Sequence, residues 1–452
     1  MLKVLIAVLM FLGGLVPSWS QADPPLAVDA AVKEALESNL GLQAEGKTLE
    51  ARTRDKAYAL QKLFPTLTAG AGYRNFNDLP AQQRLAGFSG ANTILLPTSA
   101  FNFGASINAQ FTLSLGTFAA MDQTLSDFDA GKLSYELTRQ KLEHDVKKTF
   151  YQLLSLQETR ALLQNQVSNA EARYRQVDSA YQNGSSPELN LLQADVALQN
   201  RKNDLRNLEV SFKQVSYAFC LLLGRSRYEV LSLEGTIDPR VPRDSLQADA
   251  LADKYLAGRL DLAQVKTQRR ALDVQVSEVA SQAVPQLVVG WSADPSLNDP
   301  SNQNWGNSGL WHQPTGGPSV QLQWKLDSFL PGSTFWTVLA DLDDLKIAAD
   351  LSEKRTRDAA RVEILNLVDQ IQKSTDSLAG LQKNADSADR AALLAQRAFS
   401  AGVRDLLTVQ DADLQAESAQ LSLLGEKLTL NNALIDLESA LNTSQEKIHE
   451  LQ

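Results

Sequence analysis

The stretch that decides the fold runs from Phe103 to Leu115 and reads FGASINAQFTLSL. Apolar side chains occupy its odd-numbered positions, and polar or small side chains occupy the positions between them. Successive side chains of a β-strand point to opposite faces, so this alternation predicts a strand with one apolar and one polar face. A sheet packed on a soluble core would alternate as well. The length favours a membrane, because a tilted strand needs about 9–11 residues to cross a bilayer.

Three other segments alternate as well, although 286–293 does so more weakly, because Val288 interrupts its polar face. Strands are predicted over 66–76, 286–293 and 319–327, in addition to 103–115. The loops between paired strands, 77–102 and 294–318, are rich in Pro, Gly, Asn and Ser. Long loops on one side of a sheet are typical of outer-membrane barrels, in which the polar face of the strands lines the lumen.

The sequence is internally duplicated. Gly184 and Asp195 recur as Gly402 and Asp413, at a constant shift of 218 residues. The first structural repeat is predicted over 23–235 and the second over 236–442, followed by a C-terminal tail over 443–452. Each repeat is expected to hold a helix, two strands and a long helical hairpin.

The two hairpins are predicted over 117–223 and 333–441. The first arm of each lacks proline and has a single glycine, Gly131 or Gly380. Helices of this length are typical of coiled-coil assemblies. The returning arms carry apolar residues at heptad spacing, which packs a helix against partners with a slight supercoil.

Residues 1–22 have the features of a signal peptide. Lys3 precedes an apolar run over 4–16, which is too short to span a bilayer, and small residues follow at the expected cleavage site. No cysteine near this site could carry a lipid, so we expect anchoring that does not depend on a lipid. The only cysteine, Cys220, lies in an apolar run and is expected in the core. The net charge of −10 argues against a nucleic-acid partner.

Four strands cannot close a barrel. An open edge in lipid leaves backbone N–H and C=O groups unpaired, and each such group costs several kcal/mol. The strands must therefore come from several copies of the chain around a symmetry axis. Two copies would provide about eight strands and three about twelve, and only the larger barrel leaves room for transport. Physical reasoning alone does not choose between them.

These features together resemble the TolC-like outer-membrane efflux and export channels, over nearly the whole chain that follows the signal peptide. The resemblance rests on the paired starts Asn39-Leu40-x-Leu42 and Arg259-Leu260-Asp261-Leu262, on Pro65 and Pro285 at strand entry, and on the Gly184 and Gly402 turns. It implies a transmembrane β-barrel joined to an α-helical coiled-coil barrel, closed as a homotrimer in the bacterial outer membrane. It also implies a periplasmic tunnel that docks with an adaptor protein and an inner-membrane pump, in a tripartite efflux or type I secretion system.

The resemblance further implies a gate at the periplasmic end of the tunnel. The matching positions are Asn190, Phe399, Arg404, Thr408 and Asp411. Only Asp411 supplies a carboxylate where the family has acidic side chains at two positions, and Phe399 stands where a tyrosine is common. Symmetry would gather several Asp411 side chains, which attracts cations, although a solvated helix aspartate is an equal interpretation. Arg404 is expected either to pair with an acid of a neighbouring hairpin or to lie exposed in its turn.

Four turn residues are implied as the adaptor contact: Gly184, Ser185, Gly402 and Val403. The plainer interpretation is that both glycines simply end their helices, a role that holds in either case.

Two other classes of function remain to be weighed. A structural coiled-coil tether of the envelope would need no polar strand face. An enzyme would need chemistry that the sequence lacks, since it contains no phosphate loop, nucleophile elbow or paired metal-ligand helix, so we expect no catalytic residues, cofactor or metal. His144 is expected to be a packing or surface residue. The transported substrate, the energy source of the pump and the ion selectivity stay open, although the scarcity of Met and His speaks against a copper or silver relay.

Overall fold

A computed structural model describes residues 25–75, 101–239, 247–298 and 316–443. The predicted signal peptide and nearly all of the predicted tail lie outside these ranges. The chain divides into two compact units. Unit 1 comprises Met1–Gly46, Tyr135–Leu260 and Arg357–Gln452, and unit 2 comprises Lys47–Ser134 and Asp261–Thr356. Each unit takes segments from both predicted repeats, so the compact units do not coincide with the repeats.

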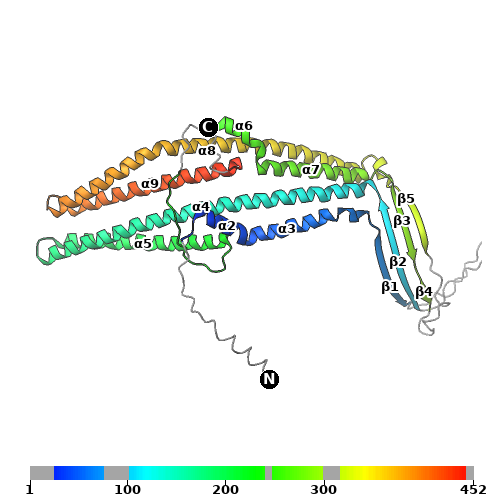
Figure 1. The fold of residues 1–452 in the computed structure, drawn as a ribbon, viewed down its shortest axis with the longest axis horizontal. Helices are drawn as coiled ribbons and strands as arrows, with labels where there is room; N and C mark the ends of the chain where they lie inside the picture. Colours follow the sequence, from blue (N-terminus) through cyan, green and yellow to red (C-terminus); the bar gives the residue numbers. More distant parts are fainter. Residues whose placement is uncertain (1–24, 76–100, 240–246, 299–315, 444–452) are drawn as a thin grey trace, which may run out of the picture. The chain divides into compact units, whose positions relative to one another are not determined.

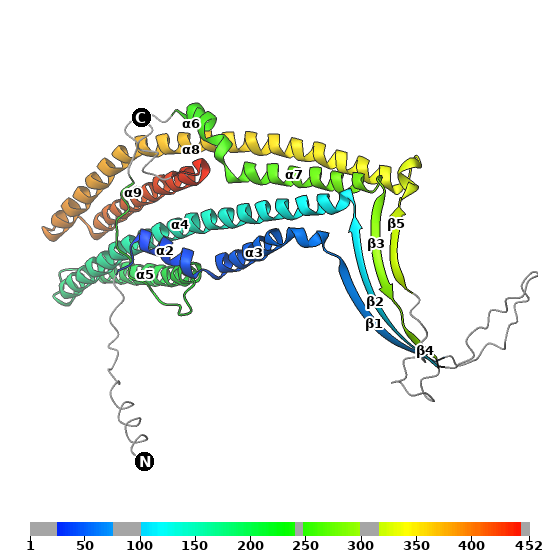
Figure 2. The same cartoon turned by 45° about the vertical axis from the view of Figure 1, so that its right-hand side comes forward.

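Unit 2 contains one antiparallel sheet (Figure 2). Its strands are β1 (Thr66–Asn75), β2 (Phe101–Leu113), β3 (Gln286–Ala293) and β5 (Gly317–Gln323), hydrogen-bonded in the order β1-β2-β3-β5. A short strand, β4 (Ser296–Asn298), also pairs with β2. The pairing of β2 with β3 joins the two repeats, because each of these strands comes from a different one.

The register places the apolar side chains of all four long strands on the same face. Ala109 of β2 faces Leu67 of β1 on one side and Trp291 of β3 on the other, and Val289 faces Val320 of β5. This face is not covered, since Leu67 is 75% exposed and Val320 is 70% exposed. An uncovered apolar face is what a sheet in lipid requires, and it argues against a sheet packed on a soluble core.

Strands β2 and β5 each begin two residues before the predicted start, and their C-terminal ends also need correction. The strand predicted to end at Leu115 ends at Leu113, because the Ser114 hydroxyl accepts a hydrogen bond from the Thr117 amide at 3.1 Å and starts the next helix. The strand predicted to end at Asp327 ends at Gln323. There the Trp324 indole turns back and donates to the Ala283 carbonyl at 2.9 Å, and a 3₁₀ turn follows.

The helix predicted ahead of each strand pair is divided into three segments. The first is divided into α2 (Val28–Ser38), α3 (Leu40–Ala57) and a 3₁₀ turn (Ala59–Leu63), and the second into α6 (Ala248–Tyr255), a 3₁₀ turn (Leu256–Gly258) and α7 (Leu260–Ser281). The first break lies at Asn39, whose Oδ1 accepts from the Leu42 amide at 3.0 Å and whose Nδ2 donates to the Leu222 carbonyl at 2.9 Å. Gly224 (φ 75°) packs so closely here that a Cβ would lie 2.2 Å from the Ser38 carbonyl oxygen.

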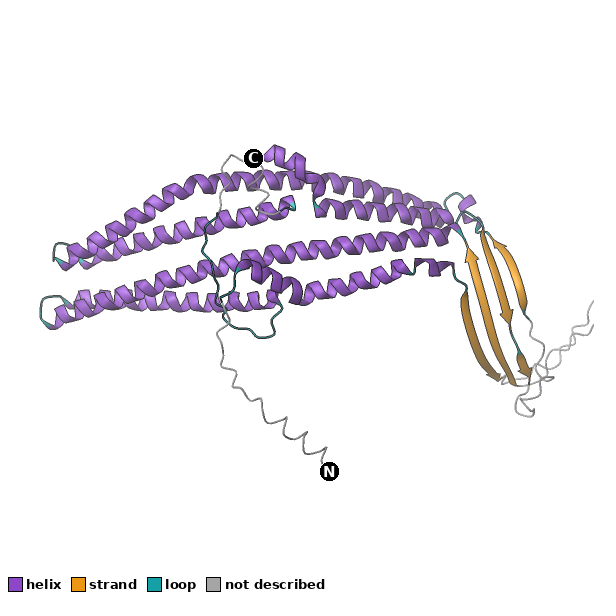
Figure 3. Ribbon diagram, viewed as in Figure 1, coloured by secondary structure: helices purple, strands orange, loops and turns teal. Residues whose placement is uncertain are grey.

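Two helical hairpins make up most of the remaining chain (Figure 3). The first is α4 (Leu115–Gln182) with α5 (Glu188–Leu223), and the second is α8 (Thr334–Ser400) with α9 (Leu406–Leu441). The first arms have 68 and 67 residues, and each returning arm has 36 and runs alongside its partner in both views (Figures 1 and 2). None of the described helices has both the length and the apolarity that a membrane-spanning helix needs.

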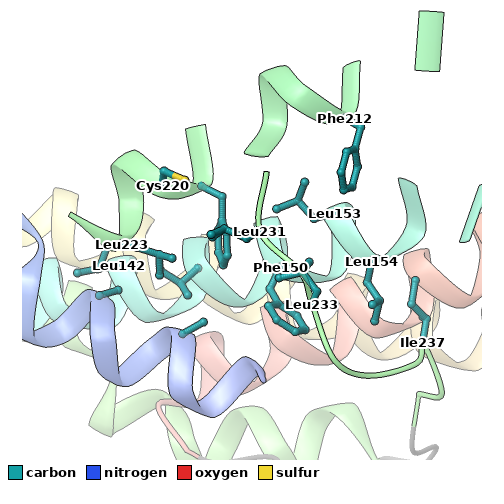
Figure 4. Close-up of a cluster of buried hydrophobic side chains, with 14 of the residues drawn as sticks. Leu142, Phe150, Leu153, Leu154, Phe212, Cys220, Leu223, Leu231, Leu233 and Ile237 are labelled. Atoms are coloured by element: carbon teal, nitrogen blue, oxygen red, sulfur yellow. The ribbon is translucent and has the colours of Figure 1, made fainter. Parts of the chain in front are cut away.

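The hydrophobic cores that the structure describes lie in unit 1. The larger one gathers side chains of α2, α3, α4 and α5 and of the segment that follows α5 (Figure 4), and the ring centroids of Phe150 and Phe219 lie 6.2 Å apart in it. Cys220 is fully buried there, and its thiol donates to the Glu229 carbonyl at 3.4 Å, which confirms its prediction as a core residue. A second core joins α6 to α8 and α9. These two cores enclose the C-terminal ends of α5 and α9, and a third, smaller cluster of Val177, Ala194 and Leu406 contains residues of both hairpins.

Candidate functional site at the tips of the hairpins

Each helical hairpin turns on a glycine in the left-handed conformation. Gly184, between α4 and α5, has a φ of 71°, and Gly402, between α8 and α9, has a φ of 73°. The amide of Ser185 donates to the Ala180 carbonyl at 2.8 Å, and Val403 makes the equivalent bond at 2.9 Å. This pattern is a Schellman cap, which satisfies carbonyls at the end of a helix. Both tips are therefore built by the same backbone device.

Helix α9 begins with a side-chain cap. Oδ1 of Asp405 accepts hydrogen bonds from the Thr408 amide at 3.0 Å and from the Thr408 hydroxyl. These two bonds, the hydroxyl bond first, lower the pKa of the exposed Asp405 carboxyl. A carboxylate at this position also complements the helix dipole. Thr408, a predicted gate residue, is thus tied to the local fold of the turn.

Two other predicted gate residues also make contacts near the tips. The Asn190 side chain donates from Nδ2 to the Ser186 hydroxyl at 3.1 Å, within its own turn. Phe399 of α8 is half-buried and packs against a small apolar cluster of Val177, Ala194 and Leu406. That cluster draws on both hairpins, so the phenyl ring contributes to the contact between them although it has no hydroxyl.

Arg404 and Asp411 are not brought together. Both side chains are exposed, and neither forms an ion pair within the part of the chain that the structure describes.

Two ion pairs that the sequence did not predict join the hairpins. Arg173 of α4 donates from Nη1 to Oδ2 of Asp413 at 2.6 Å, and Arg201 of α5 pairs with Glu417. Asp413 and Glu417 lie one turn apart on α9, so a single face of α9 meets both arms of the first hairpin. The side chains of Arg173 and Arg201 are only 12% and 15% exposed, so these pairs are partly shielded from water.

A groove of about 1040 Å³ lies beside these ion pairs, lined by α4, α5, α8 and α9. Arg173, Arg201, Asp413 and Glu417 all belong to its wall. No cluster of His, Cys, Asp and Glu suited to a metal ion occurs among the described residues. The groove therefore offers hydrogen bonds and apolar contacts to whatever enters it.

A second charged cluster links α4 to the far end of α9. Nε2 of His144 lies 2.6 Å from Oδ1 of Asp436, its Nδ1 lies 3.1 Å from Asp145, and Lys148 donates to Asp436 at 2.9 Å. The bond to Asp436 raises the pKa of His144, while burial works against the rise. Burial alone would raise the pKa of Asp436, but the bonds from His144 and Lys148 outweigh it and lower the pKa. His144, expected to be a packing or surface residue, is half-buried and bridges two helices through this bond.

Lys147, next to this cluster, forms ion pairs with two carboxylates. Its Nζ lies 2.8 Å from Glu143 and 2.7 Å from Glu438 of α9. Burial raises the pKa of Glu438, and Lys147 offsets only part of that rise. The C-terminal end of α9 is therefore held to α4 by two neighbouring polar contacts, one at Asp436 and one at Glu438. The pKa of Asp436 is lowered and that of Glu438 is raised, so the two contacts depend differently on pH.

Comparison with known families decides what this arrangement is. Residues 31–225 and 251–443 match the family described as outer membrane efflux protein. The chain belongs to this family. Its members are outer-membrane channels rather than enzymes. The match covers both predicted repeats and includes both hairpin tips.

Named relatives and solved structures of outer-membrane proteins are similar to this chain. The pyoverdine export outer membrane protein OpmQ of Pseudomonas putida is 25% identical over 353 residues, which are 74% of this chain and 70% of that protein. The CmeC outer membrane channel of Campylobacter jejuni superposes with a TM-score of 0.72 at 16% identity, over 94% of this chain and 88% of that one. The outer membrane protein VceC of Vibrio cholerae gives a TM-score of 0.70 at 15% identity, over 92% and 96% of the two chains.

The family and the shared fold show what the sheet and the hairpins form in the assembled channel. The sheet of unit 2 contributes strands to a transmembrane β-barrel, and the hairpins contribute to a helical barrel. The protein lies in the outer membrane with its helical part in the periplasm, and it is an exit duct of efflux systems.

Proposed function

We propose that three copies of this chain close one duct, which carries substrates from a periplasmic adaptor and an inner-membrane pump to the exterior. One observation carries the proposal: among the described strands, β1 and β5 each pair on one side only. Edges that lie in lipid must be paired by another copy. Three copies of a four-stranded sheet give about twelve strands, which leave an open lumen, whereas about eight would be filled by side chains.

The proposed gate combines the predicted residues with the new ion pairs. The predicted residues at the tips are Asn190, Phe399, Arg404, Thr408 and Asp411. The Arg173–Asp413 and Arg201–Glu417 pairs join the two hairpins of one chain, farther from the turns. Opening would separate hairpins at this end, so contacts between hairpins favour the closed state. We expect Arg404→Ala to leave the oligomer intact and to raise single-channel conductance. Unchanged conductance would remove Arg404 from the gate.

The adaptor is proposed to dock at the two turns, through Gly184, Ser185, Gly402 and Val403. The support is their exposure at the ends of the hairpins, where a Cβ added to Gly184 or Gly402 would meet no atom within 4 Å. The name of the relative OpmQ, a pyoverdine export protein, favours a pump that exports small molecules over one that secretes proteins.

The alternative, an envelope tether without transport, predicts a different behaviour in the same experiment. Purified protein is added to planar lipid bilayers, and unheated samples are run on SDS gels. An export duct gives discrete conductance steps and an SDS-resistant trimer. A tether gives no conductance, and that result would overturn the proposal.

A further inference from the structure

The groove between the hairpins has an unusual lining. Nine of its wall residues are Asn or Gln, and they come from all four helices that surround it. Amide side chains each offer a donor and an acceptor and carry no charge. The charged wall residues are already engaged, chiefly in the Arg173–Asp413 and Arg201–Glu417 pairs and in a hydrogen bond from Gln420 to Asp389 at 2.6 Å. The groove therefore presents mainly neutral hydrogen-bonding groups.

Two of these amides have an atom with no partner. Oε1 of Gln166 on α4 and Nε2 of Gln410 on α9 are buried and form no hydrogen bond among the described residues. Buried polar groups are nearly always paired, so such atoms call for an explanation. The Gln166 oxygen is an acceptor and the Gln410 nitrogen is a donor. A peptide group has one N–H donor and one C=O acceptor, so it can satisfy both atoms. If the amide oxygen and nitrogen of both glutamines were interchanged, one donor and one acceptor would still lack partners, so a peptide group would still fit.

The charges and apolar side chains of the groove wall further limit which class of ligand can bind. Acidic wall residues outnumber basic ones by two, with Asp204, Asp389, Asp413 and Glu417 against Arg173 and Arg201. This balance disfavours an anion. Leu192, Val196 and Leu414 add exposed apolar contact.

We propose that this groove is a transit site for neutral or weakly cationic, peptide-like cargo, which it binds through the amides of Gln166, Gln410 and their neighbours. The inference rests on the proposed export function. Binding is expected to be weak, because a conducting site must release what it binds. Rotation of the two glutamine side chains toward the groove would present their unpaired atoms to the cargo.

The test uses the full-length protein as channels in planar bilayers, with N-acetyl-tetraglycine amide as the probe and a poly(ethylene glycol) of equal mass as its match. Peptide blockades should last longer than those of the glycol. Substituting Gln166→Leu and Gln410→Leu together should shorten the peptide blockades roughly ten-fold, since two hydrogen bonds are lost. Gln199→Leu, an exposed amide outside the groove that bonds only Asp195 of its own helix, should leave them unchanged.

Three other outcomes of these experiments would overturn the inference. Equal blockades by peptide and glycol in the wild-type channel would overturn this inference alone, and this comparison decides the matter even if the double variant does not assemble. A double variant with normal blockades but weakened adaptor binding would overturn it in favour of a protein partner. A wild-type protein that forms no channel would remove the proposed export function and this inference with it.

Discussion

Asp413 illustrates how much of this molecule depends on single residues that differ between its two repeats. Its counterpart Asp195 only accepts a hydrogen bond from Gln199 of the same helix, at 3.3 Å. Asp413 instead reaches Arg173 of the other hairpin. The duplication made Asp413 recognisable in the sequence, but its role depends on a partner 240 residues away that no local pattern indicates.

The first prediction concerns this ion pair. Arg173→Met or Asp413→Leu should each lower the free energy of unfolding by about 2 kcal/mol, because each leaves a shielded charge unpaired. The double substitution should cost no more than either single one. The exposed pair Lys47–Glu50 is the matched control, and Lys47→Ala should change stability by less than about 0.5 kcal/mol. Guanidinium unfolding in detergent measures all four variants, and additive single effects would contradict the assignment.

The second prediction concerns His144 and pH. Its pKa is raised above the ordinary value of 6.5, so its stabilising contribution is complete below that value and is lost as the pH rises through the folded pKa. The difference in melting temperature between wild type and His144→Gln should thus be largest in mild acid and shrink in mild alkali. Asp436→Asn should abolish that pH dependence. A difference that stays constant across this range would rule out the charged bridge.

At the scale of elements, strands were predicted better than helix ends. Alternation reports directly on the two faces of a sheet, and the structure places the apolar side chains of the four strands on one face. The helices broke at Asn39 and Arg259 because of side-chain contacts to distant backbone, such as the Asn39 bond to Leu222. The cross-hairpin arginines were missed for the same reason: a long solvated helix tolerates many arginines, and only packing selects the few that find a carboxylate.

The third prediction concerns the turn glycines. A Cβ at Gly402 would meet nothing within 4 Å, so its φ of 73° alone sets the cost of a side chain. Gly402→Ala should lower the free energy of unfolding by about 1 kcal/mol. Gly380 lies in the interior of α8 with equally open surroundings, and Gly380→Ala should raise it by about 0.5–1 kcal/mol. Opposite signs in one denaturation experiment are expected, and equal signs would refute the explanation.

On the scale of the whole molecule, one chain leaves apolar surface that it cannot cover. The strand face remains exposed, and so do Leu345 and Leu351 of α8, which are more than half exposed. Surface of this kind in a long coiled-coil helix normally faces a partner helix. The sheet edges, the strand face and these exposed leucines of α8 thus all support closure by further copies and insertion in lipid.

The last prediction tests which face of the sheet meets lipid, with two neighbouring residues of β5 as a matched pair. Val320 lies on the apolar face and Gln321 on the polar one, where Gln321 is opposite Val288. Val320→Lys should cost about 2–4 kcal/mol per copy if the residue lies near the bilayer midplane, and so should sharply reduce the amount of SDS-resistant oligomer in the outer membrane. Gln321→Lys should assemble normally and lower the cation preference of the channel, because three added charges would line the lumen. If Gln321→Lys fails to assemble while Val320→Lys assembles, the polar face meets the lipid and the barrel has been oriented the wrong way round.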